Sequence, residues 1–375
     1  KNDEKKASLL LAQAILTSLI ISFLVTLVGI YGTGPILKFL KTNPEIIFYA
    51  KDYMDIIFLG ASLFFLQLTI NSFLVSRGDT KSLRNVLIIT FFLNLVLNPI
   101  FIYGLYFIPA MGIKGIALAT LCSQLFGLIY IILKVNKTNL KKFLNPECFI
   151  PKYNLQKEIL SQTIPATISM MLIGLGVFVL LFYVSTYGDY SAGGYGAAIR
   201  FEQLFLLPVL GLNASTLALV GQNFGAMNFV RIHETYTRSI FYGTLFMGIC
   251  GLLIFFSSDY IMYFFSDNDE IIFYGSTYLK IAAFAGPCYP IFFISSALLQ
   301  GLKKPNYQMV INLMRMVILP VCGLSVAVLY LQVNFTTMFL VVLAINYVFA
   351  AAVYKFSVYQ IDLMRKNYKP NLDAV

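Results

Sequence analysis

The chain has 375 residues, of which 59% are hydrophobic and only 12% are charged, and its formal net charge is +10. Soluble globular domains carry about 25% charged residues, so this composition excludes an ordinary soluble domain and indicates a membrane-embedded protein. The positive charge lies in short clusters between long apolar runs, which is typical of membrane topology rather than of a nucleic-acid-binding surface. We therefore expect membrane lipids, and no nucleic acid, as partners.

The sequence offers few residues that could form a metal centre or a catalytic centre. The one histidine, His233, lies in a polar connector, and the five cysteines are scattered without the spacing of metal ligands. The sequence also lacks the glycine-rich loop that binds nucleotide phosphates, so ATP-driven transport by this chain is not expected. We predict that the protein is not an enzyme and that it needs no cofactor.

Ten apolar segments are long enough to cross a bilayer core, which takes about 20 residues per helix. We expect these spans to be helical, because the alternating pattern of a membrane barrel is absent. The predicted fold class is an all-α integral membrane protein. In chain order the predicted spans are residues 8–30, 46–74, 84–107, 112–133, 159–184, 192–220, 236–257, 271–299, 307–330 and 336–358.

The basic residues predict the orientation of these spans. If the spans alternate across the membrane, most of the 27 lysine and arginine residues fall on one side. The opposite side carries the acidic run at residues 267–270. By the positive-inside rule, both visible termini are therefore expected in the cytoplasm.

A repeated pentapeptide, EIIFY, occurs at Glu45–Tyr49 and again at Glu270–Tyr274. A shift of 225 residues lays the first four spans on the last four and leaves the fifth and sixth spans without counterparts. The pattern predicts two parallel repeats of six helices, of which ten helices are visible and the first two are missing. Asn43 and Asp269 are expected to cap the two repeated helices.

The longest basic connector follows the fourth span and divides the chain. We predict an incomplete N-terminal lobe of four helices before it and a C-terminal lobe of six helices after it. The predicted divisions are the N-terminal lobe at 1–133, a cytoplasmic linker at 134–158, the C-terminal lobe at 159–358 and a cytoplasmic tail at 359–375.

Three consecutive spans each carry two polar residues four positions apart, which places both members of a pair on one helix face. Two interpretations are open: the pairs hold the bundle together by hydrogen bonds, or they build a cation or proton site from oxygen ligands. The second interpretation needs a nearby carboxylate, and these three spans carry none close to the pairs. The pairs are Gln67 with Asn71, Asn94 with Asn98, and Thr120 with Gln124.

Charged residues inside the other spans are few. Arg200 and Glu202 lie in the sixth span, where they either pair with polar groups of the second bundle or extend toward the membrane surface. Asp55 and Lys280 occupy equivalent positions in the two repeats, and we predict that they face each other across the outer mouth of a central cleft. The candidate pathway or gate residues are Gln67, Gln124, Arg200, Glu202, Asp55 and Lys280.

Several stretches resemble the multidrug and toxic compound extrusion (MATE) family. They are SRGDTKSLRNVLIITFFLNLVLNPIFIYG at Ser76–Gly104, MGIKGIALATLCSQ at Met111–Gln124, AAIRFEQLFLLPVLGLNASTLALVGQNFGAM at Ala197–Met227 and LLQGLKKPNYQMV at Leu298–Val310. The similarity runs from Lys1 to the last span. The fifth and eighth spans lack the second-lobe carboxylates of NorM-type members, so the chain looks most like the DinF-like branch.

The resemblance implies a twelve-helix antiporter of two six-helix lobes in a prokaryotic cell (plasma or inner) membrane. Such a protein expels amphipathic, often cationic compounds against H⁺ or Na⁺, and we expect a monomer. By motif, Asn71, Asn94, Asn98 and Thr120 fall on polar positions of the family's first-lobe cation site. The first-helix aspartate of that site is not in this chain, and Asn98 stands where many relatives carry aspartate. We therefore expect that this polypeptide does not couple transport by the family's usual mechanism.

Two other functions remain open. A lipid-linked oligosaccharide flippase of the same superfamily is the first alternative, but we expect such a protein to have a more cationic cavity. Arg200 and Arg315 are the only arginines away from the ends of the predicted spans. The second alternative is a truncated, non-transporting protein or scaffold. For the transporter, 34 phenylalanines and 24 tyrosines offer faces on which flat amphipathic substrates can stack.

Overall fold

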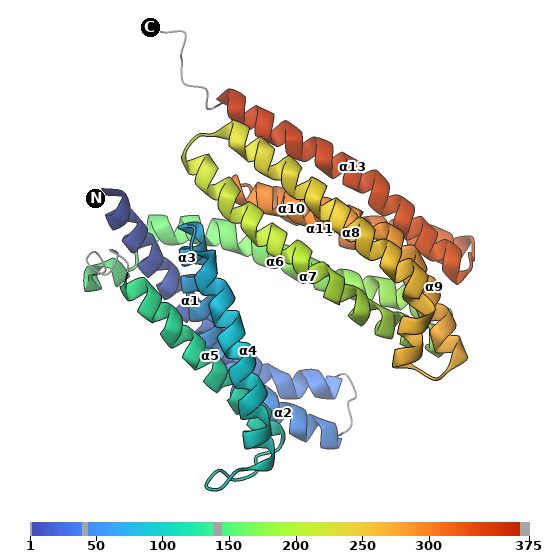
Figure 1. Cartoon of the computed structure of the whole chain (residues 1–375), viewed down its shortest axis with the longest axis horizontal. Helices are drawn as coiled ribbons and strands as arrows, with labels where there is room; N and C mark the ends of the chain where they lie inside the picture. Colours follow the sequence, from blue (N-terminus) through green and yellow to red (C-terminus); the bar gives the residue numbers. More distant parts are fainter. Residues whose placement is uncertain (1, 40–43, 138–144, 368–375) are drawn as a thin grey trace. The chain divides into compact units, whose positions relative to one another are not determined.

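The computed structural model describes residues 2–39, 44–137 and 145–367, and this part of the chain is almost entirely helical (Figure 1). An isolated antiparallel bridge between Leu105 and Ile108 is the exception. The chain divides into two compact units, Lys1–Leu160 (unit 1) and Ser161–Val375 (unit 2).

Unit 1 contains five long helices, a short 3-10 helix and the beginning of α6. The elements are α1 (Asn2–Phe39), α2 (Pro44–Leu59), α3 (Ala61–Ser76), α4 (Thr80–Tyr103), α5 (Ile113–Asn136), η2 (Pro146–Phe149) and α6 (Tyr153–Ser185). The fifth span was predicted to begin at residue 159, after the linker. In the structure the corresponding helix, α6, already begins at Tyr153, within the predicted linker. The division into lobes, linker and tail stays a prediction, and residues 138–144 and 368–375 lie outside the described residues.

Unit 2 continues from α6 through a second set of helices. One of its spans is continuous from Pro305 to Tyr330 and includes two π-helical stretches, η3 and η4. The remaining elements are α7 (Asp189–Gly225), α8 (Phe229–Phe265), α9 (Asp269–Ala285), α10 (Cys288–Gly301), α11 (Pro305–Leu313), η3 (Met314–Ile318), α12 (Leu319–Leu324), η4 (Ser325–Tyr330) and α13 (Phe335–Asn367).

The all-α membrane fold is confirmed by the described residues. Eight helices are long and apolar enough to cross a membrane, and the number is ten if each of two bent pairs counts as one span. The bent pairs are α2–α3, with an angle of 45°, and α9–α10, with an angle of 54°. Both pairs begin with a copy of EIIFY, since α2 begins at Pro44 and α9 begins at Asp269. The twelve-helix, two-lobe arrangement stays a prediction.

The cap predicted for α9 is wrong by one residue. Asn268, rather than Asp269, is the N-cap, because its Oδ1 accepts hydrogen bonds from the backbone N–H groups of Glu270 (3.0 Å) and Ile271 (3.2 Å). Asp269 is the first residue of the helix, where its negative charge is favoured by the helix dipole. The other predicted cap, Asn43, lies outside the described residues.

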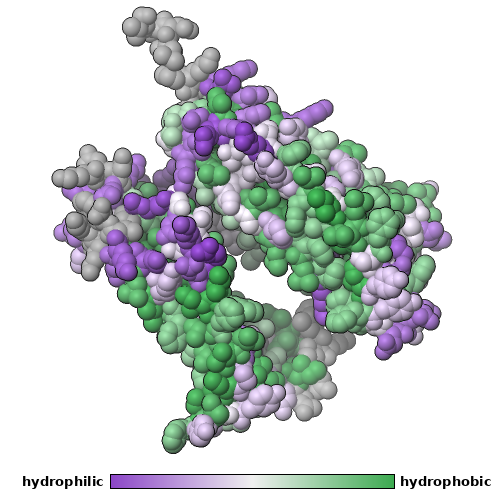
Figure 2. Space-filling view, in the orientation of Figure 1, coloured by the Kyte–Doolittle hydropathy of each residue, from purple (hydrophilic) through white to green (hydrophobic). Residues whose placement is uncertain are grey.

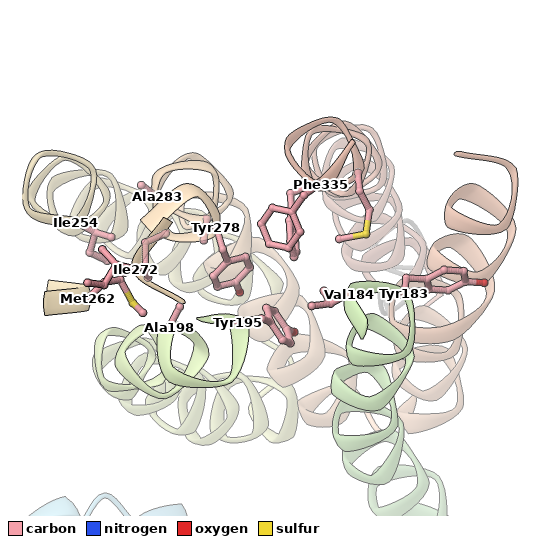
Figure 3. Packing of buried hydrophobic residues seen from close by; sticks show 14 of the residues in the cluster. Tyr183, Val184, Tyr195, Ala198, Ile254, Met262, Ile272, Tyr278, Ala283 and Phe335 are labelled. Carbon is pink, nitrogen blue, oxygen red and sulfur yellow. The ribbon is translucent and has the colours of Figure 1, made fainter. Parts of the chain in front are cut away.

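The core of unit 2 is built around aromatic side chains from α7, α9 and α13. Figure 3 shows Tyr195 and Tyr278 side by side, with Phe335 close to them. The ring centroids of Tyr195 and Tyr278 lie 4.9 Å apart, in an edge-to-face arrangement that aromatic pairs favour. This packing holds α7 against α9, which is the contact on which the site below depends.

The surface of each unit has the pattern expected in lipid. Figure 2 shows a hydrophobic band over the middle of unit 2 and hydrophilic residues at its ends. Exposed side chains in this unit include Phe241, Leu253 and Phe256 of α8 and Val348 of α13. Apolar side chains at such positions are stable in hydrocarbon, so the protein is membrane-embedded. The identity of the membrane and the side of the termini stay predictions.

Candidate functional site

The structure brings three of the predicted cation-site residues together in unit 1. Asn98 donates a hydrogen bond from Nδ2 to Oδ1 of Asn94 at 2.7 Å, and Asn94 donates from Nδ2 to Oγ1 of Thr120 at 3.3 Å. The first bond lies within α4 and the second joins α4 to α5. The i, i+4 spacing therefore does place Asn94 and Asn98 on one helix face.

Gln67 and Asn71 of α3 are also buried, with 7% and 4% of their surface exposed. Oε1 of Gln67, Oδ1 of Asn71 and Oδ1 of Asn98 have no hydrogen-bond partner among the described residues. Gln67 reaches toward α5, because its Oε1 lies 2.9 Å from the position that a Cβ atom on Gly127 would occupy.

Unit 1 thus offers neutral oxygen ligands, while α3, α4 and α5 contain no acidic residue. Gln124, the remaining member of the three pairs, is half-buried on α5. The unpartnered oxygens suit a cation or a donor, but neutral oxygens alone bind Na⁺ weakly. The assignment of this cluster as an ion site stays a prediction.

Asp55 and Lys280 each have a partner within their own unit. Asp55 forms an ion pair with Lys51 one turn away on α2. Lys280 of α9 forms one with Asp259 of α8, where Nζ lies 2.9 Å from Oδ2. The predicted pairing of Asp55 with Lys280 across a cleft stays a prediction.

Arg200 and Glu202 take different directions from α7. The Arg200 side chain is exposed, whereas Glu202 is only 6% exposed. Two hydroxyl groups donate to the Glu202 carboxylate: Tyr278 of α9 donates to Oε2, and Tyr289 of α10 donates to Oε1 at 2.7 Å. Glu202 therefore pairs with polar groups of unit 2, as one of the two interpretations of the sequence expected.

These residues line a closed-in space that we call the Glu202 cavity, with a volume of about 180 Å³. Its polar wall consists of Glu202, Gln203, Tyr195, Tyr278, Tyr289, Arg315 and Asn346. Among the described residues, Glu202 is the one acidic side chain and Arg315 the one basic side chain that are buried. The hydroxyl of Tyr195 has no hydrogen-bond partner among the described residues.

The Arg315 guanidinium is held mainly by aromatic rings. Its central carbon lies 3.9 Å from the ring centroid of Phe292 and 5.2 Å from that of Tyr289, both within cation–π range. Nε donates a hydrogen bond of 3.3 Å to Oδ1 of Asn346 on α13. Arg315 lies in the π-helical stretch η3, and such stretches are frequent at functional sites.

The site has the groups for proton exchange and not for metal binding. A buried carboxylate with two phenolic donors can gain or lose a proton by rearranging its hydrogen bonds. Within the described ranges, no group of three or more His, Cys, Asp or Glu residues is placed to hold a metal ion.

Sequence reasoning named Glu202 but missed the tyrosines, Arg315 and Asn346 as its surroundings. Tyr278 and Tyr289 lie on opposite sides of the bend between α9 and α10, so helical periodicity does not place them on one face. The available signal was chemical: Glu202 of the sixth span and Arg315 of the ninth span are charged residues that need partners in lipid.

The comparisons with known proteins agree with this architecture. The sequence profile of the MatE family matches residues 1–100 and 165–324. The chain is 28% identical over 289 residues to the probable multidrug resistance protein YpnP of Bacillus subtilis, covering 76% of this chain and 63% of YpnP. It is 24% identical over 288 residues to the multidrug export protein MepA of Staphylococcus haemolyticus, covering 77% and 63%. It is also 24% identical over 317 residues to a FAD transporter of Shewanella oneidensis, covering 84% and 70%.

The chain thus spans 63% of the length of YpnP and of MepA.

Solved structures share its fold. An outward-facing multidrug resistance MATE transporter of the MOP superfamily has a TM-score of 0.89 at 21% identity and covers 97% of this chain and 81% of its own. A MOP superfamily transporter from Pyrococcus furiosus has a TM-score of 0.86 at 19% identity, with coverages of 96% and 85%. At these identities the likeness shows the fold alone, and membership of the DinF-like branch stays a prediction. Because the family profile matches well over half of its residues, the chain belongs to the MatE family.

Proposed function

We propose that this chain performs secondary active efflux of amphipathic small molecules, including organic cations, and that a proton on Glu202 couples the transport. Relatives named multidrug resistance or multidrug export proteins support the substrate class. The protein is a transporter and not an enzyme in this proposal, and it needs no cofactor beyond the coupling ion.

The observation that carries the proposal is the pair of tyrosine hydroxyls on one buried carboxylate. With Glu202 ionised, both oxygens accept a hydrogen bond, one from Tyr278 and one from Tyr289. A proton on either oxygen adds an O–H donor there and makes that oxygen a weaker acceptor, so the tyrosine that donates to it loses a charge-assisted hydrogen bond. Protonation would therefore loosen α7 from one half of the bent α9–α10 pair.

This rearrangement would link protonation of Glu202 to a change in conformation. In alternating access, the coupling ion shifts the populations of inward-open and outward-open states because it binds one of them more tightly. Protons entering down their gradient would favour the state that releases the exported compound outside. Na⁺ coupling through the unit 1 cluster is the weaker candidate, since α3, α4 and α5 supply no carboxylate.

A flippase for lipid-linked oligosaccharides remains the alternative. A pyrophosphate group calls for several cations, whereas the Glu202 cavity holds one arginine together with a carboxylate. The Glu202 cavity therefore favours efflux over lipid flipping.

The test is ethidium transport by the purified chain in proteoliposomes under imposed gradients. We expect a pH gradient to drive ethidium movement, a proton ionophore to abolish it, and a Na⁺ gradient alone to have no effect. Movement driven by Na⁺ alone would contradict proton coupling through Glu202. Absence of transport under either gradient would favour the non-transporting scaffold.

A further inference from the structure

Arg315 is a buried cation with no carboxylate at ion-pair distance, although the charge of Glu202 acts on it through space. It is 9% exposed, and the one hydrogen bond it makes to another described residue runs from Nε to Asn346. The nearby acid, Glu202, is bound by Tyr278 and Tyr289 and forms no ion pair with Arg315. The two terminal amino groups of the guanidinium thus have no hydrogen-bond acceptor in the described part of the chain.

A second cavity meets the Glu202 cavity at Arg315. We call it the Gln308 cavity; its volume is about 510 Å³, which is within the usual range for small-molecule sites. Its described wall carries the two cations Arg315 and Lys303, several amides and hydroxyls, and no acidic residue. Gln308 is 7% exposed, and its Oε1 has no hydrogen-bond partner among the described residues.

We propose that the Gln308 cavity binds an organic anion through the terminal amino groups of Arg315. Terminal amino groups that lack acceptors make a buried guanidinium costly, and a ligand carboxylate, sulfonate or phosphate would supply those acceptors. The planar fork of arginine matches such groups in a two-point hydrogen bond. Nε2 of Gln308 can donate a further hydrogen bond to the anion, while Phe292 and Phe293 provide an apolar wall for the body of the ligand.

This site extends the proposed function to anionic ligands and does not depend on proton coupling. Lys303 lines the cavity and belongs to the connector between α10 and α11, which the charge distribution predicts to be cytoplasmic. A soluble aromatic anion and an anionic lipid share the required chemistry, so the test separates them.

The experiment measures binding of two dyes to the purified chain in neutral detergent by fluorescence anisotropy. Fluorescein is an anion and rhodamine 6G is a cation on a similar ring system. We expect saturable fluorescein binding that Arg315→Gln weakens by about tenfold or more, as the loss of a charge-assisted hydrogen bond predicts. The matched control is Arg238→Gln, which removes an exposed arginine of α8 and should leave binding unchanged.

Two further variants keep the test decisive if Arg315→Gln does not fold. Arg315→Lys should retain more fluorescein binding than Arg315→Gln, and Gln308→Leu should weaken fluorescein binding.

A displacement assay separates the two sources of the anion. Displacement of fluorescein by phosphatidylglycerol would assign the site to a lipid headgroup, and lack of displacement would assign it to a soluble anion. Equal binding of fluorescein by wild type, Arg315→Gln and Gln308→Leu, or equal weakening of rhodamine 6G and fluorescein binding by Arg315→Gln, would overturn the proposal. No ion gradient enters the assay, so its failure is distinct from failure of the proposed efflux.

Discussion

Tyr289 donates a hydrogen bond of 2.7 Å to Oε1 of Glu202 and so ties α10 to the middle of α7. Tyr278 ties α9 to the other oxygen of the same carboxylate. Because a 54° bend separates α9 from α10, one carboxylate holds both halves of a broken span. A change at Glu202 therefore acts on the geometry of that span.

We predict that Tyr289→Phe lowers the free energy of unfolding by about 1–3 kcal/mol, because a buried carboxylate oxygen loses its donor. The measurement is the thermal unfolding midpoint of the purified protein in detergent. Tyr260→Phe is the control, since Tyr260 of α8 is 79% exposed and should be neutral. Equal midpoints for the two variants would show that the Tyr289 bond contributes nothing.

Gly194 is predicted to be essential for the close approach of α7 and α9. A Cβ atom there would lie 2.7 Å from the backbone oxygen of Ile271 and 2.8 Å from the backbone nitrogen of Gly275. Gly194→Ala should therefore destabilise the protein by about 1–3 kcal/mol. Gly196→Ala on the same helix meets no atom within 4 Å and should be neutral or slightly stabilising, as alanine favours a helix. The measurement is the thermal unfolding midpoint of both variants. A lower midpoint for Gly196→Ala than for Gly194→Ala would contradict the close packing of α7 against α9.

The helix cap at Asp79 predicts a pH-dependent stability. Its carboxylate accepts hydrogen bonds from Oγ (2.6 Å) and the backbone N–H (3.0 Å) of Ser82. The hydrogen bond from the Ser82 side chain is the largest cause that lowers the pKa of Asp79. A lowered folded-state pKa means that the contribution is complete above a pH of about 4 and is lost as the pH falls through the lowered value.

Asp79→Ala should accordingly cost about 1 kcal/mol at neutral pH, and the difference from wild type should shrink in acid. The unfolding midpoint is measured as a function of pH, with Asp267→Ala at an exposed position after α8 as the control. A difference that stays constant down to acid pH would show that the charge of Asp79 plays no part.

The unit 1 cluster is predicted to lack an effect of Na⁺ on stability. Asn98 has an unpartnered Oδ1, but a hard cation needs a charged oxygen ligand to compensate for its lost hydration. Na⁺ should not raise the unfolding midpoint of the wild type relative to choline, whereas Asn98→Asp should be less stable in choline and regain stability in Na⁺. Asn98→Leu is the control that should not respond. A wild-type midpoint that rises with Na⁺ would restore the cluster as a working ion site.

The sequence alone predicted the spans well, because runs of about 20 apolar residues with few charges are stable in few places other than a bilayer. Prolines inside several spans, including Pro287 and Pro290 of the eighth, suggested bent or broken helices, but the sequence did not single out the second and eighth spans as the two that are broken. Gly60 and the Gly286–Pro287 step mark those breaks, yet glycine and proline also occur inside unbroken spans such as α7, which contains Pro208. Whether a helix breaks there depends on tertiary contacts that a single sequence does not show.

The sequence predicted the candidate site residues only where local spacing decides the contact. Local spacing was enough to bring Asn94 and Asn98 together within α4. The hydrogen-bond partners of Glu202 come from α9 and α10, at sequence distances over which periodicity carries no information. The π-helical stretch at Arg315 further shifts the helix faces from regular α-helical spacing.

The most direct test of the account is ethidium transport driven by a pH gradient in proteoliposomes that contain Glu202→Gln. Glutamine keeps the size and an acceptor oxygen but cannot take up a proton. We expect this variant to lose pH-driven transport while it still folds, and Glu270→Gln, at an exposed position at the start of α9, to transport as wild type does. Wild-type rates of pH-driven transport by Glu202→Gln would contradict the assignment of Glu202 as the coupling residue.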